Sequence, residues 1–187
     1  MTGQSPRAAR DGRSSGRSQI ATRRLRLEPL GPDDAEAMAG VLSDSGLYRF
    51  IGGTPPSPSE LKVLYARWAA GPTRAGEAWH NWVLRLADGT AVGHAQATVT
   101  GGGAAADIAW IVGAQWQGRG YATEAARAVV EWLVGNGIRD VTAHIHPDNV
   151  RSVAVAERAG LRRTTEIEDG EVVWRLATAG SDSTPGA

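Results

Sequence analysis

The chain has 187 residues, with twenty acidic and twenty basic side chains and no cysteine. A chain of this length suits one domain with its own core, and the balanced charge argues for neither nucleic acid nor a membrane surface as a partner. The lack of cysteine excludes disulfides, thiolate nucleophiles and cysteine zinc sites, and apolar runs too short to span a bilayer favour a cytoplasmic location.

Both ends of the chain are predicted to lie outside the folded domain. Residues 1–20 are rich in Gly, Ser and Arg and have almost no apolar side chain, so they should be disordered. Residues 179–187 are predicted to form a second, flexible tail. A single domain is therefore expected over residues 21–178.

The first half of the chain begins with a strand pattern, continues with two helix patterns and ends on a hairpin. Asp33 or Asp34 can cap the first helix, and Ser59 can cap the second. Asp88-Gly89 is typical of a hairpin turn. In chain order the predicted elements are a strand at residues 24–30, a helix from about 33 to 42, a helix at 60–69, and strands at 79–87 and 91–100.

The second half of the chain alternates strands and helices up to a last hairpin. The predicted strands and helices lie at residues 106–112, 122–134, 141–146, 149–159, 161–167 and 171–176. The complete order is β-α-α-β-β-β-α-β-α-β-β. This order is typical of an α/β (α+β mixed) fold, in which helices cover the faces of a mixed sheet.

The sequence Gln115-Trp-Gln-Gly-Arg-Gly-Tyr-Ala122 has the composition of an anion site. Two of its residues are glycines without side chains, so a bulky anionic ligand can approach the main chain closely. The dipole of the following helix and the Arg119 guanidinium add positive potential. We therefore predict a pyrophosphate site formed by the N–H groups of Gln117, Gly118, Arg119, Gly120, Tyr121 and Ala122.

Other phosphate motifs fit this turn less well. A P-loop requires Gly-Lys-Ser/Thr, but the one lysine of the chain, Lys62, lies elsewhere. The dinucleotide fingerprint requires a third glycine at the position of Thr123. A strand-to-helix turn without a ligand is the remaining alternative.

The segment from Gln115 to Gly120 resembles the acyl-CoA-binding motif of the GNAT N-acetyltransferase superfamily, Gln/Arg-x-x-Gly-x-Gly/Ala. Downstream, Asn149-x-x-Ser152 followed by Gly160 is similar to the closing motif of that family. The first half is similar to the branch that contains the ribosomal-protein N-terminal acetyltransferases. That branch also acetylates small amines and antibiotics.

This resemblance covers residues 21–177 and implies an acetyl-CoA-dependent N-acetyltransferase that works in a ternary complex. Its GNAT-like sheet would be splayed between the strands at 106–112 and 141–146, and the pantetheine arm would pair with the main chain near Ile111 and Val112. The acceptor would be a protein N-terminus or a small-molecule amine, no metal is required, and the protein would be a monomer or homodimer. A non-catalytic acyl-CoA-binding regulatory domain is the alternative.

Acetyl transfer requires a neutral amine, so a base is expected near the thioester. A lysine amine has a pKa of about 10.4 and must lose a proton at neutral pH. Several members of the family have a glutamate five residues before the Asn motif; His144 stands there, and an imidazole suits this role. Asp107, where many relatives have Glu, is the second candidate. Each side chain can instead be structural, as a strand histidine bonded to a neighbour or a carboxylate facing water.

The candidate acid differs from the one common in the family. Many members have a tyrosine seven residues after the Asn, where Ala156 stands in this chain. Ser152 can then protonate or hydrogen-bond the CoA sulfur, or pack within its helix. Asn149 can contact the cofactor through its amide or cap the helix. Among the tryptophans, Trp82 and Trp110 are the candidates to line an acceptor pocket.

Overall fold

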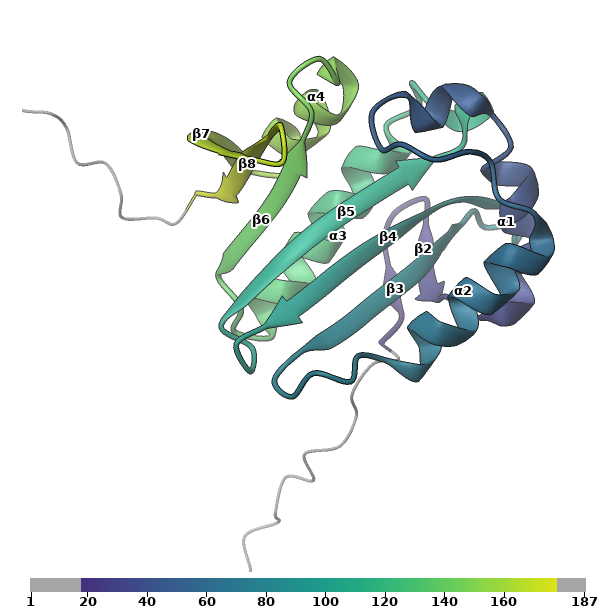
Figure 1. Ribbon diagram of the computed structural model, residues 1–187, viewed down its shortest axis with the longest axis horizontal. Coiled ribbons are helices and arrows are strands. Elements are labelled where there is room, and N and C mark those ends of the chain that lie inside the picture. Colours follow the sequence, from purple (N-terminus) through teal and green to yellow (C-terminus); the bar gives the residue numbers. More distant parts are fainter. Residues whose placement is uncertain (1–17, 178–187) are drawn as a thin grey trace, which may run out of the picture.

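One mixed sheet forms the centre of the fold, seen in a computed structural model that describes residues 18–177 (Figure 1). The strand order is β1-β2-β3-β4-β5-β6-β8-β7, and among the strands of residues 18–177 only the β5–β6 pair is parallel. Except for residues 18–20 at the start, the predicted tails lie outside the described residues. The strands are β1 (Ile20–Ala21), β2 (Arg26–Pro29), β3 (Ala78–Arg85), β4 (Ala91–Thr100), β5 (Ala105–Val112), β6 (Asp140–Ile145), β7 (Leu161–Glu168) and β8 (Glu171–Leu176).

Helices cover both faces of this sheet. Val83 and Leu84 of β3 are consecutive and point to opposite faces. Val83 packs with Met38 and Leu61 beneath α1 and α2, whereas Leu84 joins the cluster that contains Leu133 of α3. The helices are α1 (Ala35–Val41), α2 (Pro58–Ala70), α3 (Tyr121–Gly135) and α4 (Val150–Arg158), with short 3-10 turns η1 (Pro32–Asp34), η2 (Ser45–Arg49) and η3 (Ala114–Trp116).

The helix α3 shows how the sequence pattern becomes packing. Ala126, Val129 and Leu133 recur at helical spacing, as predicted, and all three are buried beneath the sheet. Full burial of a side chain such as Leu133 contributes about 1.5–3 kcal/mol. This burial holds the N-terminus of α3 at a fixed place behind the end of β5 (Figure 1).

The sheet opens between its two parallel strands. β5 and β6 pair only at Ala105 with Asp140, Ala106 with Val141 and Asp107 with Thr142. Beyond these positions β5 continues beside β4, while β6 continues beside β8. Figure 1 shows the two strands diverging toward the end of β5. The splayed sheet and the order of elements are therefore as predicted, with β1 as an additional strand.

Two predicted helix caps are wrong. Ser57, not Ser59, caps α2: its Oγ accepts the N–H of Glu60, whose carboxylate accepts the N–H of Ser57 at 2.7 Å. The helix starts earlier than predicted because Pro58 suits the first helical position. At α1, the Asp34 carboxylate accepts the N–H of Gly31 instead of capping the helix.

Candidate functional site

The glycine turn before α3 explains why its sequence carries two glycines. Gly118 has a φ of 74° and Gly120 a φ of 82°. Both values lie in the left-handed region that favours glycine, so the backbone itself requires these residues. A Cβ at Gly118 would meet no atom within 4 Å, which leaves the outer side of the turn open.

The N-terminus of α3 has no side-chain cap in the described chain, unlike α2, which Ser57 caps, and α4, which Asn149 caps. The first N–H groups of a helix have no partner within the helix, and the helix dipole favours an anion beside them. Within residues 18–177, the N–H groups of this turn that lack a protein acceptor belong to Gly118, Arg119, Gly120, Tyr121 and Ala122. These groups fit the predicted anion site.

Gln117 takes part in the candidate site through its side chain and not through its backbone N–H. Its N–H donates to the Ala114 carbonyl at 3.2 Å and closes η3, so the prediction that this N–H joins the anion site is wrong. The side-chain amide donates to the Val112 carbonyl at 3.0 Å and accepts from Arg151 Nη1 at 2.6 Å. Gln117 thereby connects the end of β5 to the first turn of α4.

Arg24, which the sequence analysis did not identify, contacts this turn from the segment before β2. Its Nε donates to Glu124 Oε2 at 2.6 Å, its Nη1 donates to the Arg119 carbonyl at 2.9 Å, and its guanidinium lies 4.9 Å from the centre of the Tyr121 ring. Burial alone would raise the pKa of Glu124, but hydrogen bonds from Thr22 and Arg24 lower it. A second cation, besides the exposed Arg119, is therefore fixed beside the glycine turn.

The main chain of β5 presents polar groups to the gap between β5 and β6. Gly113 donates its N–H to the Val92 carbonyl of β4 at 3.0 Å. Because the direction of the N–H alternates in an antiparallel ladder, Val112 and Trp110 face the gap and Ile111 faces β4. Of the two residues predicted to pair with pantetheine, Val112 is thus the one on the gap side.

Two contacts involve the segments that follow β5 and β6. One is the bond between Gln117 and Arg151 described above. The other joins Phe50, which follows η2, and His146, which follows β6; their ring centroids are 5.2 Å apart. The first contact joins the segment after β5 to α4. The second joins the segment after β6 to the segment after η2.

The two candidate bases lie together where β5 and β6 begin to diverge. His144 Nε2 is 3.6 Å from Asp107 Oδ1, and His144 Nδ1 is 3.8 Å from Glu168 Oε2. Thr142 donates its hydroxyl to Asp107 Oδ1 at 3.3 Å. The structure therefore brings His144 and Asp107 into one cluster, which the sequence alone does not show.

The carboxyl of Asp107 is held in an environment that disfavours its charge. Burial raises the pKa of Asp107 above its ordinary value. His144 and the Thr142 hydroxyl lower this pKa, whereas the carboxylates of Glu171 and Glu168 raise it. A carboxyl with a raised pKa accepts a proton more readily, which is the property required of a base.

The two polar residues at the start of α4 differ in what they bind. Asn149 Oδ1 accepts the N–H of Ser152 at 3.2 Å and caps the helix. The Asn149 amide nitrogen and the Ser152 hydroxyl donate to no acceptor within the described residues. Both groups are half-buried and stay available for a cofactor contact.

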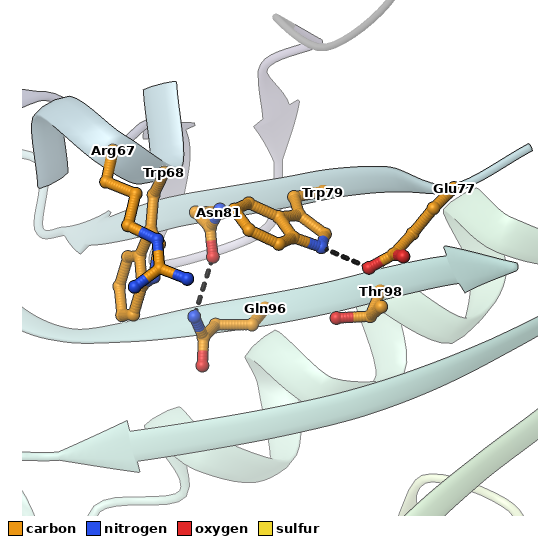
Figure 2. A pocket seen from close by; sticks show the side chains of 7 residues that line it. All are labelled: Arg67, Trp68, Glu77, Trp79, Asn81, Gln96 and Thr98. Carbon is orange, nitrogen blue, oxygen red and sulfur yellow. Dashed lines mark hydrogen bonds between the residues drawn. The ribbon is translucent and has the colours of Figure 1, made fainter. Parts of the chain in front are cut away.

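A pocket of about 330 Å³ lies between α2, β3 and β4 (Figure 2). Trp79 Nε1 donates to Glu77 Oε1 at 2.6 Å, and Gln96 Nε2 donates to Asn81 Oδ1 at 2.7 Å. Thr98 of the pocket floor is the register partner of Asp107 on β5. Cross-strand partners share a face of the sheet, so the pocket and Asp107 lie on the same face. Its walls are completed by Arg67 and Trp68.

The tryptophans of this pocket are not those that the sequence reasoning favoured. Trp82 is 2% exposed, donates its indole N–H to the Ser18 carbonyl and packs edge-on against Trp132. Trp82 and Trp110 both belong to the core on the α3 face. The strand alternation places Trp79 on the opposite face from Trp82.

Beside the pocket, His94 of β4 stacks on Trp68 with ring centroids 5.9 Å apart. Burial lowers the pKa of His94 to about 4, so its imidazole is neutral at neutral pH. Tyr65 also packs against Trp68, with ring centroids 5.5 Å apart. Its burial raises the pKa of the phenol well above its ordinary value.

Among residues 18–177 no group of three or more His, Cys, Asp or Glu side chains is arranged to hold a metal ion. In the same range no helix is long and apolar enough to cross a membrane.

Comparison with known proteins identifies the family. A family model described as an acetyltransferase (GNAT) domain matches residues 24–162. The chain belongs to the GNAT acetyltransferase family. The uncharacterized N-acetyltransferase YnaD of Bacillus subtilis (strain 168) is 24% identical over 149 residues, which cover 77% of this chain and 82% of that protein.

Solved structures share the fold of this GNAT acetyltransferase. A proposed ribosomal-protein-serine acetyltransferase from Vibrio cholerae gives a TM-score of 0.70 at 20% identity, and the match covers 86% of this chain and 98% of that one. An aminoglycoside acetyltransferase in complex with coenzyme A gives 0.65 at 22% identity, covering 83% and 94%. The predicted GNAT family, the mixed α/β fold and the N-acetyltransferase class are confirmed.

The predicted site of this GNAT acetyltransferase falls into three places. The anion-site residues gather at the start of α3, where the Gln117 side chain bonds to Val112 at the end of β5. His144 and Asp107 gather at the vertex of the gap. Ser152 and Asn149 lie in the first turn of α4.

Proposed function

We propose that this chain transfers the acetyl group of acetyl-CoA to a primary amine by direct attack in a ternary complex. The observation that supports this most strongly is the uncapped, left-handed glycine turn at the start of α3, which faces outward beside Arg24 and Arg119. In this proposal the turn holds the pyrophosphate of CoA. An aminoglycoside acetyltransferase of the same fold was solved with coenzyme A, which is consistent with this role.

The pantetheine arm would lie in the gap between β5 and β6. Main-chain groups of Val112 and Trp110 face this gap and are the natural partners of an extended amide chain. Their N–H groups would also stabilise the oxyanion that forms when the thioester carbonyl is attacked. Because Gln117 donates to the Val112 carbonyl, this side chain would have to share or yield that acceptor when the arm binds.

The chemical step needs one proton removed and one supplied. A C–N bond forms between the amine and the acetyl carbon, and the C–S bond to CoA breaks. The Asp107–His144 pair would take the amine proton, directly or through a water. The Ser152 hydroxyl, without a hydrogen-bond acceptor among the described residues, would protonate or hydrogen-bond the departing thiolate. No step in this scheme calls for a metal ion.

One observation favours a second function. Ala156 stands where many members of the family have the catalytic tyrosine, and its side chain is fully buried. A chain without this hydroxyl could have kept the CoA site as an acyl-CoA sensor without catalysis. In either case the cytoplasmic location, the monomeric or homodimeric state and the absence of nucleic-acid and membrane partners remain part of the proposal.

Release of free CoA thiol from acetyl-CoA, measured against a panel of primary amines, separates the two functions. An enzyme releases thiol only when amine is present, and His144→Ala should lower turnover by ~10²–10⁴-fold while acetyl-CoA affinity stays nearly intact. The matched variant is Asp107→Asn, which keeps the size of the side chain. Loss of turnover in Asp107→Asn alone would make Asp107 the base. Binding of acetyl-CoA without thiol release for any amine would favour the sensor.

A further inference from the structure

The pocket between α2 and β4 has side chains of opposite charge at its two ends, Arg67 and Glu77. At the α2 end, the Arg67 guanidinium makes no hydrogen bond or ion pair within the described residues. Figure 2 shows the guanidinium on the same side of the pocket as the hydrogen-bonded pair Asn81–Gln96. That pair leaves the Asn81 amide NH₂ free to donate as well. This end of the pocket therefore offers donors, one of them charged, to an anionic group.

The opposite end of the same face is acidic. Glu77 lies beside Thr98 at that end of the pocket (Figure 2), and Thr98 is the cross-strand partner of Asp107. Beyond Asp107, the carboxylates of Glu168 and Glu171 face the same cluster. A protonated amine is attracted to this end, next to the groups proposed to remove its proton.

The two ends are separated by the width of the intervening strands. Asn81 is on β3, its partner Gln96 is on β4, and Asp107 is on β5. Neighbouring strands lie ~4.8 Å apart, so the anion-binding end and the base lie on the order of 10 Å apart. The amine and carboxylate of one α-amino acid are too close together to reach both ends. An acceptor that does so has a chain between its amine and its anionic group.

We infer that the acceptor of this GNAT acetyltransferase is an amino-carboxylate of extended shape, with its reactive amine at the Asp107–His144 end and its anionic group on Arg67. An ω-amino acid has this shape, and so does a dipeptide whose carboxyl end lies in the pocket. Trp68 and Trp79 would pack against the connecting chain. This inference rests on the proposed acetyl transfer, since it names the substrate class of the same site.

The test compares three acceptors of equal chain length: ε-aminocaproate, its primary amide, and hexylamine. The wild-type KM should be about tenfold lower for ε-aminocaproate than for the two analogues that lack a carboxylate, as expected for a charged hydrogen bond in a partly exposed site. Arg67→Gln should remove this preference by raising KM for the acid alone, with kcat unchanged. Lys62→Gln, which removes a cation from the exposed surface of the same helix, is the matched control and should keep the preference.

Calorimetric titration of ε-aminocaproate into the protein saturated with CoA gives a readout that does not depend on turnover. Binding that is lost in Arg67→Gln and kept in Lys62→Gln supports the inference, even if no amine is acetylated and the proposed function fails. Acetylation of all three acceptors with equal KM overturns the inference while the proposed function stands. No binding of ε-aminocaproate, or a preference that survives Arg67→Gln, overturns it as well.

Discussion

Replacing His94 by phenylalanine should make the protein more resistant to acid. Burial lowers the pKa of His94 from 6.5 to about 4, so the folded state disfavours the charged imidazole. The unfolded chain therefore binds more protons between these two values, and folding stability falls as the pH falls from about 6.5 to about 4. Since one pKa unit corresponds to about 1.4 kcal/mol, the loss attributable to this residue is about 3 kcal/mol.

Urea unfolding of both proteins at several pH values between 4 and 8 measures this effect. Phenylalanine can keep the stacking on Trp68, and the buried Nδ1 of His94 has no hydrogen-bond partner to lose within the described residues. The difference between variant and wild type removes the contribution of carboxyl groups that titrate in the same range. The free energy of unfolding of the variant should gain about 3 kcal/mol on wild type between pH 7 and pH 4. A difference that does not change with pH would refute the reasoning.

Three further predictions concern the base, the helix cap and the anion site. Asp107→Asn should raise the free energy of unfolding at pH 7, because burial raises the pKa of this carboxyl and the folded state disfavours its charge. This gain in stability should vanish as the pH falls below 4, and a loss of stability at pH 7 would contradict the prediction. Ser57→Ala should cost about 1 kcal/mol in urea unfolding and Ser59→Ala much less, whereas equal costs would contradict the assignment of Ser57 as the cap of α2. Arg119→Ala should weaken CoA by about 1–3 kcal/mol in calorimetry if the guanidinium meets a phosphate, and unchanged affinity for both CoA and dephospho-CoA would place Arg119 in solvent.

The parts of the fold that depend on local patterns were predictable from the sequence. Gly118 and Gly120 indicate a turn that only glycine favours, and the structure gives both a left-handed φ. The apolar spacing of α3 indicates its buried face. The cap of α2 was misplaced because Ser57 and Ser59 are equally good cap residues; the position of Pro58 decides between them.

The parts that depend on tertiary contacts were not predictable in the same way. Arg24 reaches the glycine turn through Glu124, a hundred residues away in the chain. Trp79 and Trp82 lie on opposite faces of β3, and the sequence does not say which face carries the pocket. The alternation along β3 predicts which side chains share a face of the strand. Whether that face lines a pocket or joins the core depends on how α2 or α3 packs against it.

Acetyl-CoA binding by paired glutamate variants tests the central claim most directly. Gly120 and Gly137 both have a left-handed φ and lie at opposite ends of α3, so Gly120→Glu and Gly137→Glu carry similar backbone strain and the same added charge. At a hundredfold excess over Kd, acetyl-CoA should stabilise the native state by about 2.7 kcal/mol and raise the melting temperature by roughly 5 °C or more. Wild type and Gly137→Glu should show this rise, and Gly120→Glu should show none. An equal rise in a folded Gly120→Glu protein, or no rise in wild type, would contradict the assignment of the glycine turn as the acetyl-CoA site.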